Sequence, residues 1–172
     1  MIRIPNIEAG RVDLRDLKYA RDDERLVDGE ELKPGDLLVI RTNGSRSLIG
    51  RCAVIREPLA RATTYASYLI RFRLVRLPAL FAWVGAIWDY GFVRAWIEQR
   101  AATSAGQHNI SMSVLNGLPL PLPPLAEQER IVTEVERLLS LVEELEAVVT
   151  ANLQRATNLR QSILERAFKG ES

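Results

Sequence analysis

The stretch LPLPLPPLAEQERIV, residues 118–132, joins two patterns with opposite demands on the backbone. Prolines occupy alternate positions and then double at Pro123 and Pro124. This favours an extended path with few conformations, because proline fixes φ and has no backbone N–H. A repeat with helical spacing follows directly. We therefore predict a stiff joint over residues 118–125, hereafter the proline-rich joint, that leads into one long helix over residues 126–170.

The predicted helix carries an apolar stripe with a seven-residue repeat. At about 1.5 Å per residue the helix is roughly 60 Å long, so a small domain in the same chain cannot cover the stripe. The sequence thus predicts pairing with another helix, from a second copy or another chain. One heptad position takes Gln128, Val135, Val142, Val149, Ala156 and Ile163, and the other takes Ile131, Leu138, Leu145, Asn152 and Leu159.

Six apolar members of these two positions form the predicted pairing surface. They are Val135, Leu138, Val142, Leu145, Val149 and Leu159. Asn152 is the polar exception, and two interpretations of it stand. A single buried polar residue fixes the register of a coiled coil, whereas an exposed asparagine has no such role.

Residues 1–117 have the pattern of a folded domain with short strands and turns. Residues 33–36 (KPGD) predict a turn before an apolar strand over residues 37–40, and Asn43-Gly44 predicts a tight turn before a return strand over residues 48–55. A further strand is expected over residues 65–75, and two short helices that break near residues 89–91. We interpret residues 104–117 as a polar loop. The fold class predicted is α+β, a small mixed domain followed by one long helix.

Arginines concentrate within this domain. Residues 41–76 hold eight arginines and one acidic residue, a net charge of +7, although the whole chain has a net charge of only +1. The planar fork of arginine binds phosphates and guanine edges in a bidentate way, which favours a nucleic-acid partner. High genomic GC content also replaces lysine with arginine, so this second interpretation stays open.

Two segments of the domain hold the candidate DNA-contacting side chains. These segments are residues 41–51 and 104–109. Arg41, Arg46 and Arg51 have the chemistry for guanine edges or phosphates, and Asn43, Gln107 and Asn109 have amides that pair with adenine. Each has an ordinary alternative as a surface residue, and Asn43 as part of a turn. Three tryptophans at helical spacing are interpreted as core rather than as a base-stacking platform. The full candidate set is Arg41, Asn43, Ser45, Arg46, Arg51, Gln107, His108 and Asn109.

Catalytic and cofactor sites are not predicted. The chain has no glycine-rich phosphate loop, and its single histidine and single cysteine cannot form a zinc cluster or an internal disulfide. Cys52 is interpreted as a small residue on a buried strand. The opening MIRIPNIEAG lacks the apolar run of a secretory signal, and the longest apolar stretch, residues 79–88, is far shorter than a membrane span. We expect a cytoplasmic protein that is not an enzyme and has no cofactor, metal or membrane partner.

The sequence resembles the specificity subunit of type I restriction-modification systems. The residues that carry the resemblance are LPLPLPPLAEQERIVTEVERLLSLVEELEA (118–147), supported by IPNIEAGRVDLRDLKY (4–19), LKPGDLLVIRTNGSRSLIGRCAVI (32–55) and the SAGQHNIS segment (104–111). The resemblance implies a target recognition domain over residues 1–117 that contacts half of a bipartite DNA site. It also implies a spacer helix that packs antiparallel against a second one.

The same resemblance implies the partners. These would be double-stranded DNA, a second copy or the other half of a specificity subunit, two methyltransferase subunits that modify adenine, and through them the motor-nuclease subunit. Family members carry two recognition domains and two spacers, whereas this chain has one of each, and its domain begins later than theirs. Two interpretations follow, a half-subunit that dimerises or a C-terminal portion. A truncated assembly module that pairs without binding DNA is the alternative function.

Overall fold

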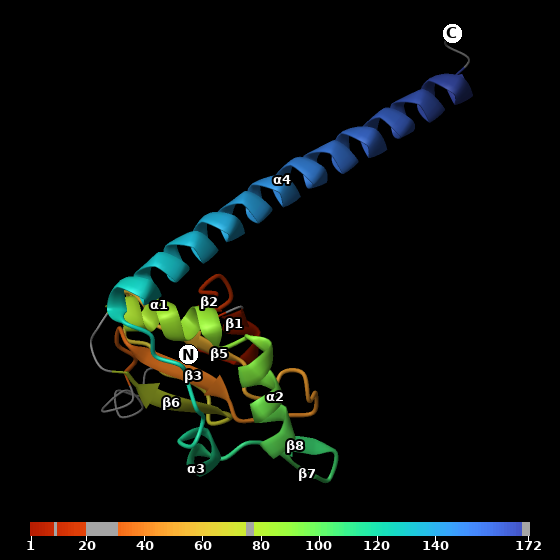
Figure 1. The fold of residues 1–172 in the computed structure, drawn as a ribbon. Coiled ribbons are helices and arrows are strands. Elements are labelled where there is room, and N and C mark those ends of the chain that lie inside the picture. The colour runs from red at the N-terminus through yellow and green to blue at the C-terminus, as the bar shows by residue number, and fades with distance from the viewer. Residues whose placement is uncertain (9, 20–30, 75–77, 170–172) are drawn as a thin grey trace. The chain divides into compact units, whose positions relative to one another are not determined.

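The computed structural model describes residues 1–8, 10–19, 31–74 and 78–169 (Figure 1). Its backbone divides into two compact units, Met1–Val132 and Thr133–Ser172. The first unit holds all the strands and the shorter helices, together with the first two turns of the long helix. The predicted α+β fold class, with small sheets and a long C-terminal helix, is confirmed.

The centre of the first unit is an antiparallel sheet in the order β5–β3–β6, formed by Cys52–Val54, Asp36–Ile40 and Leu69–Arg73. All five residues of β3 are buried, as expected for a central strand that is covered on both faces. The predicted strand over residues 48–55 was too long. Residues 46–50 form turns, and Gly50 has a φ of +72°, a left-handed conformation that interrupts an extended strand.

A buried ion pair fixes one end of this sheet. The Arg73 Nε donates to Asp36 Oδ1 at 2.7 Å, and a terminal nitrogen of Arg73 donates to Asp36 Oδ2 at 2.9 Å. The Lys33 backbone N–H donates to Asp36 Oδ2 at 2.8 Å. The Asp36 side chain is fully buried, whereas that of Arg73 is 50% exposed. One arginine of the predicted basic segment therefore neutralises a carboxylate of the core.

The N-terminal residues contact the central sheet at β5. The opening contains a short 3₁₀ helix, η1 (Ile4–Asn6), before the hairpin of β1 (Ile7–Glu8) and β2 (Arg11–Val12). Gly10 bridges to β5, and a Cβ at Gly10 would lie 2.6 Å from the carbonyl oxygen of Gly85 in α1. Glycine is therefore required where the hairpin and the helix meet.

The two predicted short helices are confirmed as α1 (Pro78–Ile87) and α2 (Gly91–Arg100). Helix α1 contacts β5. Trp83 and Trp88 are buried, which agrees with their interpretation as core, and Trp96 is half-buried beneath Arg100. Cys52 is buried on β5, as predicted.

A second sheet occupies the region predicted as a polar loop. Strands β7 (Ala102–Ser104) and β8 (Gln107–Asn109) form a hairpin, and β4 (Thr42–Asn43) adds to β8 in antiparallel orientation. A short helix, α3 (Met112–Leu115), follows. The loop interpretation was therefore wrong. Figure 1 shows the β7–β8 hairpin at an edge of the domain.

The long helix is confirmed as α4 (Leu125–Lys169), which begins one residue before the predicted start. In the second unit, residues 137–166 are exposed throughout, and this includes the apolar stripe. Among the helices of the described chain, none combines the length and apolar character required to cross a membrane.

Candidate nucleic-acid interface

The structure brings the two predicted DNA-contacting segments together in the second sheet. In the register of β4 and β8, Thr42 pairs with Asn109 and Asn43 pairs with His108. The backbone N–H of Ile110 donates to the carbonyl oxygen of Arg41 at 2.9 Å, which continues the contact between the segments. Candidate residues that lie far apart in the sequence thus share one small sheet.

The hairpin that carries β8 ends in a tight turn. Ala105 has a φ of 49° and Gly106 a φ of 76°, and both belong to the left-handed region that a two-residue type I′ hairpin turn requires. Alanine is uncommon at such a position because its Cβ crowds the carbonyl oxygen. A Cβ added at Gly106 would meet no atom within 4 Å, so the tip is open to solvent.

The two faces of the hairpin differ in burial. His108 is half-buried and Ile110 is buried, whereas Gln107 and Asn109 are exposed. Because side chains alternate across a strand, His108 faces inward and the two amides face outward. The hydroxyl of Thr103, the exposed β7 residue paired with His108, forms a hydrogen bond of 2.9 Å with His108 Nδ1.

The loop between β4 and β5 is fixed by its own turn and by α2. The Asn43 Oδ1 accepts a hydrogen bond from the Ser45 backbone N–H at 2.7 Å, which is the predicted turn role of this asparagine. The Ser45 and Ser47 hydroxyls lie 2.9 Å apart. The Arg94 guanidinium in α2 donates to the carbonyl oxygen of Ile49 at 2.9 Å.

Buried neighbours further restrain this loop. The indole N–H of Trp88 donates to the carbonyl oxygen of Gly50 at 2.6 Å. A Cβ at Gly50 would lie 2.4 Å from Cγ2 of Ile97, so no larger residue fits there without movement. Trp88 and Arg94 are thus positioning residues that sequence reasoning missed. Their roles depend on long-range contacts, for which the local pattern holds no signal.

The arginines of the predicted basic segment have separate roles. Arg46 donates to the carbonyl oxygen of Glu98 at 3.0 Å, and Arg51 donates to that of Ser47 at 3.1 Å. Both side chains and that of Arg41 are exposed, so their remaining N–H groups face solvent. By contrast, Arg73 is paired in the core, and Arg61 and Arg71 stack over tyrosine rings.

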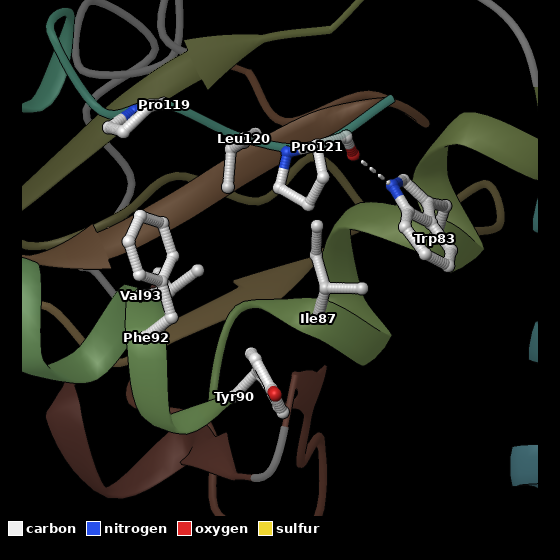
Figure 2. A pocket seen from close by; sticks show the side chains of 8 residues that line it. All are labelled: Trp83, Ile87, Tyr90, Phe92, Val93, Pro119, Leu120 and Pro121. Carbon is white, nitrogen blue, oxygen red and sulfur yellow. Dashed lines mark hydrogen bonds between the residues drawn. The ribbon is translucent and has the colours of Figure 1, made fainter. Parts of the chain in front are cut away.

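The proline-rich joint is held by two side-chain donors within the first unit. The indole N–H of Trp83 donates to the carbonyl oxygen of Pro121 at 2.9 Å (Figure 2). The side-chain amide of Gln128 donates to the carbonyl oxygen of Pro123 at 2.7 Å. Gln128 is only 7% exposed, so this predicted seam residue is used inside the first unit.

An apolar cavity of about 640 Å³ lies between the joint and the two short helices (Figure 2). Its wall joins the prolines of the joint to side chains of α1 and α2. The lining residues are Trp83, Ile87, Tyr90, Phe92, Val93, Pro119, Leu120 and Pro121.

The predicted pairing residues of α4 present a second candidate surface, described here for the second unit alone. Val135 is half-buried, and the next five are exposed by 48–65%. Isolated apolar residues on a surface are normal, whereas a continuous apolar stripe indicates a partner. The exposed members are Leu138, Val142, Leu145, Val149 and Leu159.

No protein-family model matches the chain. The type I restriction enzyme EcoKI specificity subunit of Escherichia coli K12 is 33% identical over 171 residues, which are 99% of this chain and 37% of that protein. The StySPI specificity subunit of Salmonella potsdam is 36% identical over 140 residues, 81% of this chain and 30% of that protein. The EcoBI specificity subunit of Escherichia coli is 28% identical over 176 residues, 99% of this chain and 35% of that protein. The chain spans about a third of the length of these relatives.

Proposed function

Because the chain is related to type I restriction enzyme specificity subunits over almost its whole length, we propose that it is a non-catalytic DNA-recognition component of a type I restriction-modification complex. Its domain contacts one half of a bipartite DNA site. The observation that carries this proposal is the 171-residue match, which includes the domain, the proline-rich joint and the long helix together.

The second sheet and the adjoining loop support DNA binding. They present uncharged hydrogen-bonding side chains beside the exposed guanidinium groups of Arg41, Arg46 and Arg51. In protein–DNA complexes, contacts to phosphates fix the position of the protein while polar side chains at base edges provide specificity. In this proposal the arginines bind phosphates or guanine edges, and the exposed side chains of β8, Gln107 and Asn109, contact bases.

The exposed stripe of α4 supports helix pairing. A second copy, or the other half of a specificity subunit, supplies an antiparallel helix that covers the stripe, and methyltransferase subunits dock on the assembled pair. Adenine methylation belongs to those subunits, and the motor-nuclease subunit joins through them. This chain determines which DNA sequence is modified.

Salt-dependent DNA binding tests the recognition role. Fluorescence anisotropy with the full chain and a labelled duplex of mixed sequence should give a binding constant that falls steeply with salt concentration, because bound cations release counterions. Arg46→Gln and Arg51→Gln should each reduce the salt slope by about 1 if the residue contacts a phosphate. Arg155→Gln, on the exposed part of α4, is the matched control and should leave the slope unchanged.

Methylation assays test the partnership. An adenine methyltransferase that co-purifies with this chain should modify a defined sequence only when the chain is present. Unchanged site choice with and without the chain would contradict the recognition role. Absence of DNA binding by a chain that still pairs through α4 would favour the alternative function, an assembly module that pairs without binding DNA.

A further inference from the structure

We propose that the outward face of β8 determines part of the target sequence, with Gln107 and Asn109 each pairing with an adenine of two A·T base pairs that are separated by one base pair. This proposal rests on the proposed function. It specifies which side chains of the second sheet contact bases and at what spacing.

The burial of β8 distinguishes its two faces. Exposure alternates from Gln107, which is exposed, through the half-buried His108 to Asn109, which is again exposed. Buried Ile110 continues the inward face. The hairpin lies at an edge of the domain (Figure 1), and the amides of Gln107 and Asn109 are exposed there.

The hydrogen-bonding groups of the outward face are not used within the protein. Across the described ranges, no side-chain hydrogen bond involves Gln107 or Asn109. By contrast, Asn43 accepts from Ser45 and His108 bonds with Thr103 on the inward face. A side-chain amide needs both its donor and its acceptor to pair with adenine N7 and N6. Among the candidates, Gln107 and Asn109 have both groups available.

Small neighbours leave room for a base beside each amide. The residue paired with Gln107 on β7 is Ser104, and Asn109 is paired with Ala102 on β7 and with Thr42 on β4. Such cross-strand partners lie about 4.5–5.5 Å apart at Cβ, where a long or charged side chain would block a base edge. The turn at the tip of the hairpin is also narrow, because Ala105 and Gly106 have little or no side chain. Strand β4 pairs with β8 at His108 and Asn109, so the hairpin is two-stranded only toward its tip, at the Ser104–Gln107 pair. The major groove, about 12 Å wide, admits a two-stranded ribbon.

The spacing of the two amides follows from strand geometry. An antiparallel strand rises about 3.4 Å per residue, so side chains two residues apart on one face are separated by roughly 7 Å along the strand. Successive base pairs of B-DNA are about 3.4 Å apart. If β8 runs along the groove, Gln107 and Asn109 therefore reach base pairs two steps apart. Adenine can lie on either DNA strand at each position.

Selection from a randomised duplex pool tests this proposal. The full chain is incubated with double-stranded oligonucleotides that contain a random central segment, and bound molecules are sequenced. The unsubstituted chain should enrich two A·T pairs with one base pair between them. Gln107→Ala should abolish the preference at one of these pairs and Asn109→Ala at the other, each by at least about fivefold, the lower bound expected of one bidentate contact.

A charge-changing variant and an inward-face control sharpen the test. Gln107→Glu should shift the preference at its position from adenine to cytosine, because a carboxylate accepts a hydrogen bond from the cytosine amino group. Thr103→Val removes the hydroxyl that bonds His108 and should leave the selected sequence unchanged. Loss of a structural role alone would not create a new base preference.

The outcomes distinguish the base contacts of Gln107 and Asn109 from DNA recognition by the chain as a whole. Selection of the same sequence by the unsubstituted chain and by both alanine variants would overturn the role of Gln107 and Asn109 while leaving DNA recognition intact. A selected sequence without A·T pairs at this spacing would do the same. No salt-sensitive binding of any duplex by the unsubstituted chain would overturn DNA recognition itself, and the base contacts with it.

Discussion

The side-chain amide of Gln128 donates a hydrogen bond to the backbone carbonyl oxygen of Pro123, so the first turn of α4 is tied to the joint that precedes it. The carbonyl oxygen of Pro124 also accepts from the backbone N–H groups of Glu127 and Gln128, which begins the helix. A segment rich in proline lacks most of the N–H groups that would restrain it. Donors from outside the segment, Trp83 and Gln128, replace them.

Removing one of these donors should destabilise the first unit. Trp83→Phe removes the hydrogen bond to the Pro121 carbonyl oxygen and should lower the free energy of unfolding by about 0.5–1.5 kcal/mol, the net contribution of one hydrogen bond, because Pro121 is exposed and water can replace the lost donor. Urea unfolding measures the change. Trp96→Phe is the control, since the Trp96 ring lies under Arg100 and is half-buried. An equal loss in the two variants would contradict a specific role for the hydrogen bond.

The stability of the domain should depend strongly on the positive charge beside the buried carboxylate of Asp36. Arg73→Met leaves a fully buried carboxylate without its counter-charge and should cost about 3–5 kcal/mol of stability in urea unfolding. Arg73→Lys retains the charge but not the two-pronged contact, so its loss should be smaller. If both variants unfolded at the urea concentration of the parent chain, the pair would have no stabilising role.

The reaction of the Cys52 thiol with a thiol reagent should measure unfolding of the domain. Its burial raises the pKa of the thiol well above the ordinary value of 9.0, and the charge of Asp89 adds to this. The folded chain should therefore resist a thiol reagent at about pH 8, since only the thiolate reacts, and denaturant should release the reaction. Because the folded pKa is raised, the unfolded state ionises first, and stability should decline as pH rises above 9.0. Cys52→Ala should lack that decline, and rapid labelling of the native chain would contradict the burial.

A substitution in the turn of the β7–β8 hairpin should increase the stability of the domain. Ala105→Asn places a residue that favours positive φ at a position where alanine is strained, and it should raise stability by about 0.5–1 kcal/mol. Thermal unfolding measures this. The same substitution at Ala102, on the extended strand β7, should give no gain. A destabilised Ala105→Asn variant would show that the turn is not formed in solution.

Pairing through α4 should depend on its apolar stripe. In sedimentation at tens of micromolar, the parent chain should form a dimer or larger assembly. Two aspartates in place of Leu145 and Val149 should give a monomer, because charges cannot occupy a coiled-coil seam. Thr150→Asp, an exposed position beside the seam, is the control and should preserve the assembly. A strictly monomeric parent chain would contradict pairing.

The parts of the fold that local periodicity determines were predictable. The helices α1, α2 and α4 repeat apolar residues at helical spacing over ten residues or more, so their existence follows from sequence. The strand β5 was predicted too long, over residues 48–55. Gly50, in a left-handed conformation, ends the extended path before β5, and Ile97 in α2 leaves no room for a Cβ there, a contact that local sequence does not reveal.

The sequence nominates the candidate residues, which remain a prediction, but it does not reveal the sheet that brings them together. The β7–β8 hairpin has polar strands and an Ala-Gly turn, so it lacks both the apolar alternation and the Asn-Gly dipeptide that signal a hairpin. Its addition to β4 joins segments more than fifty residues apart. Those pairings separate Asn43 and His108, on the inward face, from Gln107 and Asn109, on the outward one.

The second sheet has a consequence for how such a chain changes over evolutionary time. Residues 102–107 are exposed throughout, and the buried core lies elsewhere, on β3, β5 and the short helices. Substitutions of exposed residues alter stability by only about 0.5 kcal/mol. Mutation can therefore introduce new side chains on this hairpin with little cost to folding. Under the base contacts proposed above, a few such replacements would change the target preference while the rest of the domain is retained.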